Sequence, residues 1–329
     1  MATVILAGDI GGTNTRLGLF RVENGAPTLI GSHRYATAHF ASLEAVCADF
    51  LRLSRDAISS ACFGVPGPII GGAAHATNVS WTMREESLAR ALNGTPVRLI
   101  NDLGATAYGV MHLDDSEVSV LQKSALPINQ GNVAVIAAGT GLGEAGLAYE
   151  NGRHYAIASE GGHASFAPQN DEQVELYRYL RARFGHVSSE RVLSGPGLFN
   201  IYSFLRTRRT TEEPKWLTEL LEEEDAGAVI SEAALERRDP ECIRALEIFV
   251  DIYGAEAGNL ALKMLALGGV YVSGGIAPKI LPALRDGRFM RAFADKGRLN
   301  EMLSKIEVRV AMNEDAALIG AAWLAASML

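Results

Sequence analysis

Cysteine is scarce in this chain of 329 residues, and its three cysteines lie far apart. Cys47, Cys62 and Cys242 form no C-x-x-C pair, so the sequence indicates neither a disulfide framework nor a cysteine-based zinc site. Sparse, unpaired cysteines are typical of proteins from a reducing compartment. We therefore expect a cytoplasmic protein.

Long apolar runs and clusters of positive charge are also missing. The longest uncharged apolar-leaning run, AALIGAAWLAASML from Ala316, is too short to span a bilayer and predicts a buried helix. The opening segment MATVILAGD has no basic stretch before its apolar residues, so we predict no signal peptide. The net charge is −8 and no Lys/Arg run offsets it, which argues against nucleic acid or a membrane as a partner.

What remains is a globular composition, 48% hydrophobic and 21% charged, in a chain long enough for two domains. In AGDIGGTNTRLGLF we predict strands at Val4–Ala7 and Arg16–Phe20, joined by a glycine-rich turn. The plan recurs in VAVIAAG, a strand, TGLGEAG, a turn, and LAYENGRHYAIAS, a hairpin with an Asn-Gly tip. The recurrence predicts two α/β domains of similar plan that face a shared cleft.

Capping residues predict where the helices begin. NDLGATAYGV turns from the strand PVRLI into a helix, and Asp239 with Pro240 begins a long helix in the mostly helical region that precedes VYVSGG. For the last helix we expect Asn313 as the cap, with Glu314 and Asp315 in the first turn, where the helix dipole favours acidic side chains.

The two glycine-rich turns could present backbone N–H groups to phosphate oxygens. Gly141, Gly143 and Gly146 match G-x-G-x-x-G, yet a hairpin rather than a helix follows, which argues against a dinucleotide-binding fold. Neither loop carries the lysine of a P-loop. One such loop alone is best interpreted as a tight hairpin, whereas two, one in each half of the chain, favour phosphate binding.

Three further clusters carry polar groups at strand ends or in glycine-rich loops. Asp102 follows a buried strand and begins a helix, so it is either a helix cap or a general base kept ionised by the helix dipole. In SEGGHASFAP, Glu160 and His163 flank two glycines, and Glu190 follows in SSERVLSGPG. Their spacing is poor for a metal and suits hydrogen bonds to a polyhydroxyl ligand. VYVSGG ends a strand on two glycines, which alone indicates only a turn.

In this order and spacing, the motifs resemble the bacterial glucokinase family of the sugar-kinase and actin ATPase superfamily. The resemblance extends from about Val4 to the last helix and is carried by DIGGTNTRLGLF, INDLGATAYG, AGTGLGEAGL, SEGGHASFAP, ERVLSGPGLFN and VYVSGGIAP. It implies an α/β fold with two actin-like ATPase (ribonuclease H-like) domains around a central cleft. The small domain would be residues 1–112, completed by the C-terminal helix at 313–329, and the large domain residues 113–312.

The resemblance also implies the reaction and the residues that perform it. Glucose would be phosphorylated at its 6-hydroxyl by ATP with Mg²⁺, giving glucose 6-phosphate and ADP, in a homodimeric enzyme. Asp102 would be the catalytic base and would contact the sugar together with Asn101, Glu160, His163 and Glu190. Asp9 would approach the metal through water. The residues implied at the ATP phosphates and adenosine are Asp9, Gly11, Gly12, Thr13, Asn14, Gly139, Thr140, Gly141, Gly143, Gly274 and Gly275.

Two alternatives differ in chemistry. A kinase for another hexose or an amino sugar would keep Asp102 and change the sugar pocket, and a non-catalytic actin-like nucleotide switch would need only the glycine loops. Related sugar kinases and repressors carry a zinc-binding cysteine cluster after the Glu-x-x-x-His region. No cysteine lies between Gly64 and Pro240, so we expect a member of the branch without zinc.

Overall fold

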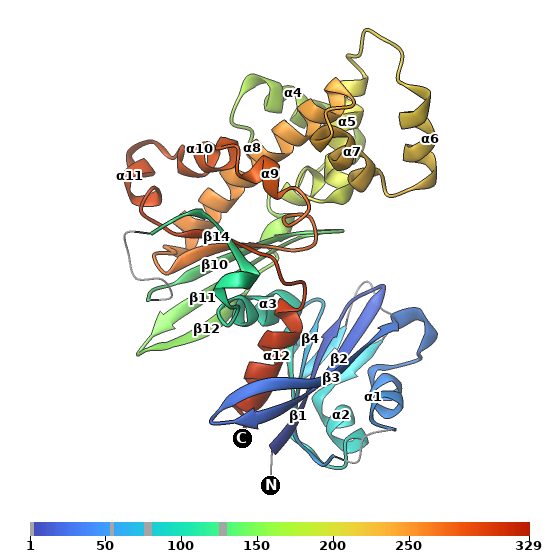
Figure 1. The fold of residues 1–329 in the computed structure, drawn as a ribbon, viewed down its shortest axis with the longest axis vertical. Helices are drawn as coiled ribbons and strands as arrows, with labels where there is room; N and C mark the ends of the chain where they lie inside the picture. Colours follow the sequence, from blue (N-terminus) through green and yellow to red (C-terminus); the bar gives the residue numbers. More distant parts are fainter. Residues whose placement is uncertain (1–2, 53–55, 76–80, 125–129) are drawn as a thin grey trace. The chain divides into compact units, whose positions relative to one another are not determined.

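The computed structural model describes residues 3–52, 56–75, 81–124 and 130–329 and divides into two compact units (Figure 1). The first unit contains Met1–Asp114, Ala156–Ala158 and Asn313–Leu329. The second unit contains Asp115–Tyr155 and Ser159–Met312.

The first unit is built on a five-stranded sheet with the strand order β3-β2-β1-β4-β8. β1 pairs antiparallel with β2, and β2 with β3, whereas β1, β4 and β8 are parallel. A small second sheet has the order β5-β6-β7. The strands are β1 (Thr3–Ile10), β2 (Asn14–Glu23), β3 (Ala26–Ala36), β4 (Ile58–Val65), β5 (Ile69–Ile70), β6 (Ala73–His75), β7 (Thr82–Arg84) and β8 (Val97–Asn101). The first hairpin is longer than predicted, so its turn shrinks to three residues.

Helices cover this sheet. Figure 1 shows α12 lying across it, and the apolar side of α12 buries Leu318 and Leu324 against Ile5 and Phe20. α12 also packs closely on α3, because a Cβ added at Gly320 would overlap the backbone of that helix. The helices of this unit are η1 (Thr37–His39), α1 (Leu43–Leu51), α2 (Glu85–Ala91), α3 (Asp102–Val110) and α12 (Ala316–Ala326).

The start of α12 differs from the prediction. The residue at the N-cap position is Asp315, and its side chain makes no capping hydrogen bond. Asn313 Oδ1 instead accepts a hydrogen bond from the Asp315 backbone N–H at 2.8 Å, outside the helix. Asp315 was predicted to lie in the first turn of this helix. Its carboxylate instead forms an ion pair with Arg16 of β2.

The second unit repeats the plan of the first around a six-stranded sheet of order β12-β11-β10-β13-β14-β9. β10 pairs antiparallel with β11, while β10, β13 and β14 are parallel and β9 is antiparallel to β14. A hairpin followed by parallel strands is thus common to both units. The strands of this sheet are β9 (Val118–Gln122), β10 (Val133–Ala138), β11 (Leu142–Glu150), β12 (Arg153–Ala158, whose last three residues are grouped with the first unit), β13 (Gly269–Ser273) and β14 (Val308–Ala311).

Helices of the second unit gather on one side of its sheet (Figure 1). The long helix α8 (Pro240–Met264) begins where predicted, because the Asp239 side chain accepts a hydrogen bond from the Cys242 N–H. Buried apolar residues of α8 pack with those of the strands and of the surrounding helices in one hydrophobic core. These other helices are η2 (Asp115–Glu117), η3 (Gly161–His163), α4 (Asp171–Phe184), η4 (Ser189–Arg191), α5 (Gly195–Arg206), α6 (Lys215–Glu223), α7 (Ala226–Leu235), α9 (Leu281–Leu284), α10 (Arg288–Ala294), η5 (Gly297–Leu299) and α11 (Asn300–Leu303).

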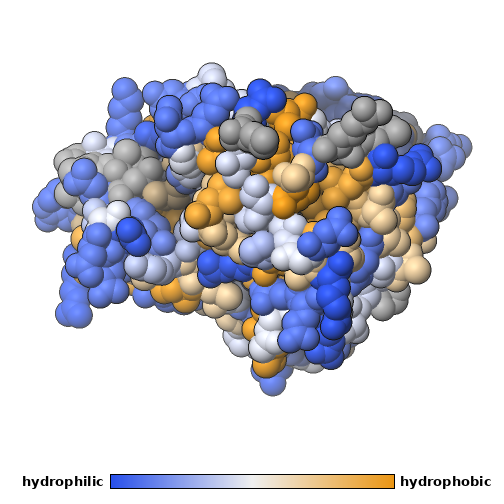
Figure 2. Space-filling view, turned by 90° about the horizontal axis from the view of Figure 1, so that it is seen from below, coloured by the Kyte–Doolittle hydropathy of each residue, from blue (hydrophilic) through white to orange (hydrophobic). Residues whose placement is uncertain are grey.

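Figure 2 shows one face on which hydrophobic residues are gathered among hydrophilic ones. Within the described ranges no helix combines the length and apolarity that crossing a membrane requires. The buried helix predicted from Ala316 is confirmed as α12, which packs within the first unit.

Candidate functional site

Polar residues of the first unit lie at the carboxyl ends of its parallel strands. Asp9 of β1 is in register with Gly64 of β4, and Val65 of β4 with Asn101 of β8. Neighbouring strands are about 4.8 Å apart, so Asp9 and Asn101 share an edge roughly 10 Å wide. This edge is where open α/β sheets bind ligands.

The turn between β1 and β2 is held from within and from outside. Gly11 N–H donates to Asn14 O at 2.8 Å. Thr37 forms two further hydrogen bonds to the turn. Its Oγ1 donates to Gly11 O at 2.8 Å, and its backbone N–H donates to Thr13 O at 3.0 Å. Gly12, Thr13 and Asn14 remain exposed. The loop therefore keeps a fixed shape while its tip is open to a ligand.

Asp9 is a carboxyl in a poorly hydrated place. Burial raises the pKa of Asp9 above its usual range, and the charges of Arg16 and Arg34 oppose this rise. The structure thus provides one desolvated carboxyl group at the end of β1. A cation near it would offset the cost of ionising it.

The two residues at the start of α3 have separate structural roles. Asn101 is the N-cap, because its Oδ1 accepts the Gly104 N–H at 3.2 Å while its Nδ2 donates to Gly67 O at 3.3 Å. Asp102 is the first residue of the helix, and its Oδ1 accepts the Leu103 N–H at 2.8 Å. The sequence left Asp102 as either a helix cap or a general base. The structure gives the cap position to Asn101 instead.

The second glycine loop and the glycine pair after β13 are adjacent in the second unit. Gly139 N–H donates to Gly141 O at 2.8 Å, which closes the turn, and Gly139 O accepts from Gly195 N–H at the start of α5. Gly274 has φ +85°, and a Cβ there would lie 2.4 Å from Ala138 O. Only glycine fits this position, because the end of β10 lies directly against it.

These loops line a cavity of about 460 Å³. Gly227 at the start of α7 lies so close to Gly195 that a Cβ on it would be 2.9 Å from that residue, so the N-termini of α5 and α7 meet at the cavity. Of the residues that line the cavity, Gly139, Thr140 and Gly275 were predicted from the sequence to bind ATP, and the others were not. The other lining residues are Gly195, Pro196, Leu198, Asp225, Gly227, Ala228, Ser231, Ile276, Lys279 and Ile280.

Glu190 on η4 is joined directly to the second glycine loop. Its Oε2 accepts a hydrogen bond from Leu142 N–H at 3.0 Å. A Cβ at Gly141 would lie 2.6 Å from the same oxygen. A residue predicted to bind sugar therefore shapes the loop predicted to bind phosphate.

Glu160 and His163 lie at the two ends of the short turn η3, beside η4. Their side chains are well exposed, with Glu160 Oε2 and His163 Nε2 4.0 Å apart. Ser189 N–H donates to Ala164 O at 2.9 Å, which ties η4 to the residue after η3. The second unit thus brings Glu160, His163 and Glu190 together around the start of β11. Within the described ranges no group of three His, Cys, Asp or Glu side chains is placed to hold a metal ion.

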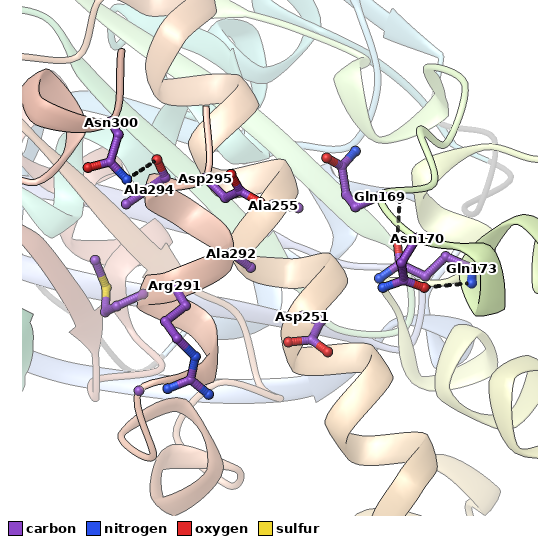
Figure 3. A pocket seen from close by; sticks show the side chains of 12 residues that line it. Gln169, Asn170, Gln173, Asp251, Ala255, Arg291, Ala292, Ala294, Asp295 and Asn300 are labelled. Atoms are coloured by element: carbon purple, nitrogen blue, oxygen red, sulfur yellow. Dashed lines mark hydrogen bonds between the residues drawn. The ribbon is translucent and has the colours of Figure 1, made fainter. Parts of the chain in front are cut away.

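A larger cavity, of about 740 Å³, lies elsewhere in the second unit, among α4, α8 and α10 (Figure 3). None of the predicted site residues lines it. Several of its polar groups are already engaged: Asn300 donates to Ala294 O at 2.9 Å, Asn170 accepts from Gln173 N–H at 3.0 Å, and Asp251 pairs with Arg288.

The repeated sheet plan, with glycine loops and acidic residues at strand ends, defines an α/β protein of the sugar-kinase class with the actin-like ATPase fold. A solved glucokinase from an Antarctic psychrotroph has this fold, with a TM-score of 0.86 and 31% identity, covering 99% of this chain and 100% of that chain. The predicted α/β fold class is confirmed.

Sequence comparison narrows the class. The glucokinase profile matches residues 6–328. A glucokinase from Nostoc punctiforme is 40% identical and one from Nostoc sp. is 39% identical, each over 99% of this chain and 100% of its own length. The chain belongs to the glucokinase family, which confirms the resemblance drawn from its motifs.

Proposed function

We propose that this chain transfers the γ-phosphoryl group of ATP to the 6-hydroxyl of glucose, giving glucose 6-phosphate and ADP. The observation that carries the proposal is the match to glucokinases over nearly the whole chain. The convergence of Glu160, His163 and Glu190 around the second glycine loop supports it, because a phosphotransferase must hold acceptor and donor close together.

Asp102 is the proposed general base. It takes the proton from the 6-hydroxyl as that oxygen forms a bond to the γ-phosphorus and the bond to the β-phosphate oxygen breaks, releasing ADP. Its position as the first residue of α3 supports this role, because the helix dipole favours a charged carboxylate there. Asn101 supplies the cap, so the helix does not depend on Asp102 for this purpose.

The sugar is proposed to contact Asn101, Glu160, His163 and Glu190 as well as Asp102. Carboxylates accept hydrogen bonds from hydroxyls, and an imidazole can accept or donate. A sugar that lacks one hydroxyl would leave such a group unpaired, which can cost several orders of magnitude in specificity. The choice of glucose over other hexoses would arise from these contacts.

ATP is proposed to place its adenosine in the 460 Å³ cavity and its phosphates along the two glycine loops. Gly139, Thr140 and Gly275 line this cavity, which supports the site because a nucleoside bound there would have its phosphates beside the second glycine loop. The lone carboxyl of Asp9 fits Mg²⁺, which is usually bound by one or two carboxylates together with water and substrate phosphates. When bound, Mg²⁺ would neutralise charge on the phosphoryl oxygens.

A sugar-by-nucleotide activity panel on the purified protein, with ADP release as the signal, tests the proposal. Glucose-dependent ADP release with ATP and Mg²⁺ is expected, and a zinc-selective chelator should leave it unchanged. Much faster turnover of another hexose or an amino sugar would replace glucose as the substrate. Nucleotide binding without sugar-dependent turnover would favour the actin-like switch.

We also propose that the protein works as a homodimer in the cytoplasm. The family resemblance supports the dimer, and the three buried free cysteines suit a reducing compartment. Sedimentation of the purified protein at enzyme-assay concentrations would test the assembly, and a monomer under those conditions would contradict it.

A further inference from the structure

A buried acid lies directly beneath the Glu160–His163 segment. Glu144, the third residue of β11, is 1% exposed. A Cβ added at Gly161 would lie 2.2 Å from its Oε2, so this oxygen touches the backbone of η3. Its Oε1 is buried and accepts no hydrogen bond from an N–H or hydroxyl group in the part of the chain that the structure describes. No step of the proposed reaction uses this carboxyl.

The groups around Glu144 do not neutralise a second negative charge. On α8, Glu256 is 6% exposed, and its own carboxylate is occupied by Asn259 Nδ2 at 3.0 Å and Lys263 Nζ at 3.3 Å. Lys296, which follows α10, is close enough to interact electrostatically with Glu256 and with its own neighbour Asp295. From the loops above come Glu160 and His163 of the η3 segment and Glu190, which is bonded to Leu142 at the start of the same strand.

Glu144 and Glu256 are both buried, and one lysine, Lys263, is bonded to Glu256. This arrangement favours one negative charge on the pair rather than two. Burial, followed by the charge of Glu256, raises the pKa of Glu144 to about 7. Lys263 opposes the rise, and a hydrogen bond between the Glu144 and Glu256 carboxyls adds to it. Near neutral pH the Glu144 carboxyl is therefore close to the midpoint between its neutral and charged forms. The neutral form is compatible with the dry contact against Gly161. The charged form leaves an unpaired buried oxygen beneath a loop that bears another carboxylate.

We propose that Glu144 is a positioning residue for sugar binding, whose protonated carboxyl seats the Ser159–His163 segment and whose ionisation loosens it. The inference rests on the proposed function in that Glu160 and His163 bind the sugar. Once ionised, Glu144 must gain water or a cation, and the thin cover over it is the glycine backbone of η3. Displacing that backbone moves Glu160 and His163 out of register with the sugar hydroxyls.

The expected effect falls on glucose affinity rather than turnover. If only the protonated form binds well, the apparent Kd is the intrinsic value divided by the protonated fraction. With a pKa of about 7, the apparent Kd then rises roughly tenfold between pH 6 and pH 8. At saturating glucose the segment is held by substrate, so kcat should change much less than KM.

The experiment measures glucose Kd by calorimetry without nucleotide, and kcat and KM for both substrates, from pH 5.5 to 9. Glu144→Gln, a neutral side chain of the same shape, should keep the tight low-pH affinity across the range. Any remaining pH dependence in that variant then belongs to other groups, including His163. Glu144→Asp, which titrates but is shorter, should bind glucose more weakly at every pH. Glu150→Gln, at the exposed far end of β11, is the matched control and should follow the wild type.

The outcomes separate this inference from the proposed function. A wild type that phosphorylates glucose with a pH-independent Kd and KM overturns the role of Glu144 and leaves the function intact. The same holds if Glu144→Gln retains the full wild-type pH dependence. Absence of glucose phosphorylation at every pH overturns the function itself. Should Glu144→Gln fail to fold, the wild-type Kd profile together with Glu144→Asp still decides.

Discussion

Replacing Asp102 by Asn, and Asn101 by Ala, should separate catalysis from stability at two adjacent positions. Asn101 forms the capping bond to Gly104 N–H, whereas Asp102 accepts a hydrogen bond from Leu103 N–H, the next residue of α3. An Asn at position 102 keeps the shape and an accepting oxygen. It removes the negative charge and the ability to accept a proton.

The magnitudes differ for the two variants. General-base catalysis contributes about 10²–10⁴-fold, or roughly 3–5 kcal/mol of barrier, so Asp102→Asn should lower kcat by that factor. The charge–dipole interaction that this variant loses at the start of α3 is worth about 0.3–1 kcal/mol. Asn101→Ala loses a cap, about 1 kcal/mol, which would lower Tm by about 2–4 °C.

The assay is steady-state kinetics at saturating glucose and ATP, with thermal melting of the same preparations. Asp102→Asn should lose kcat while Tm and glucose affinity stay close to wild type. Asn101→Ala should lower Tm and raise KM for glucose, with a smaller loss of kcat. Turnover by Asp102→Asn within a few-fold of wild type would refute general-base catalysis by Asp102, whatever the behaviour of Asn101→Ala.

Three further substitutions test the second unit. Gly274→Ala should lower Tm and ATP affinity, because a φ of +85° costs an alanine about 1–2 kcal/mol. Gly275→Ala is the control: a Cβ there meets nothing within 4 Å, so its Tm should stay close to wild type. Equal melting temperatures for the two variants would contradict this reasoning. Gly141→Ala should raise KM for glucose as well as ATP because it displaces Glu190, and an unchanged glucose KM would refute the coupling. Glu144→Gln should gain stability over wild type as pH rises from 4.5 to 7, by at most about 3 kcal/mol, because the wild-type folded state increasingly retains a proton that the unfolded state has lost; parallel Tm curves would exclude it.

Much of the fold could be predicted because its signals are local. Alternating or continuous apolar runs give the strands, and Asp239 with Pro240 gives the start of α8. The start of α12 could not be predicted in the same way. Asn, Glu and Asp before an apolar run fit several caps equally well, and the choice depends on Arg16, which is about 300 residues away in the chain.

The candidate site also has parts with local sequence signals and parts that depend on contacts between distant residues. Strand ends and glycine loops are visible in sequence, so the positions of Asp9 and Asp102 at one sheet edge follow from the parallel pairing. The cavity residues Asp225, Ser231 and Lys279 gave no comparable signal, because they come from separate segments that meet only in the fold. For Asp225 the only local sign was a helix cap, which is also its structural role.

Three glycines of the second unit are needed for close packing, which their sequence motifs alone did not indicate. A Cβ at Gly162 would lie 2.0 Å from Leu142 O, one at Gly161 would lie 2.2 Å from Glu144 Oε2, and one at Gly141 would lie 2.6 Å from Glu190 Oε2. Each of these glycines is therefore needed for packing against another motif, before any ligand is considered. Three segments distant in sequence are interlocked at the start of β11. A change in the second glycine loop should then also affect Glu160, His163 and Glu190, because all three segments pack against the start of β11.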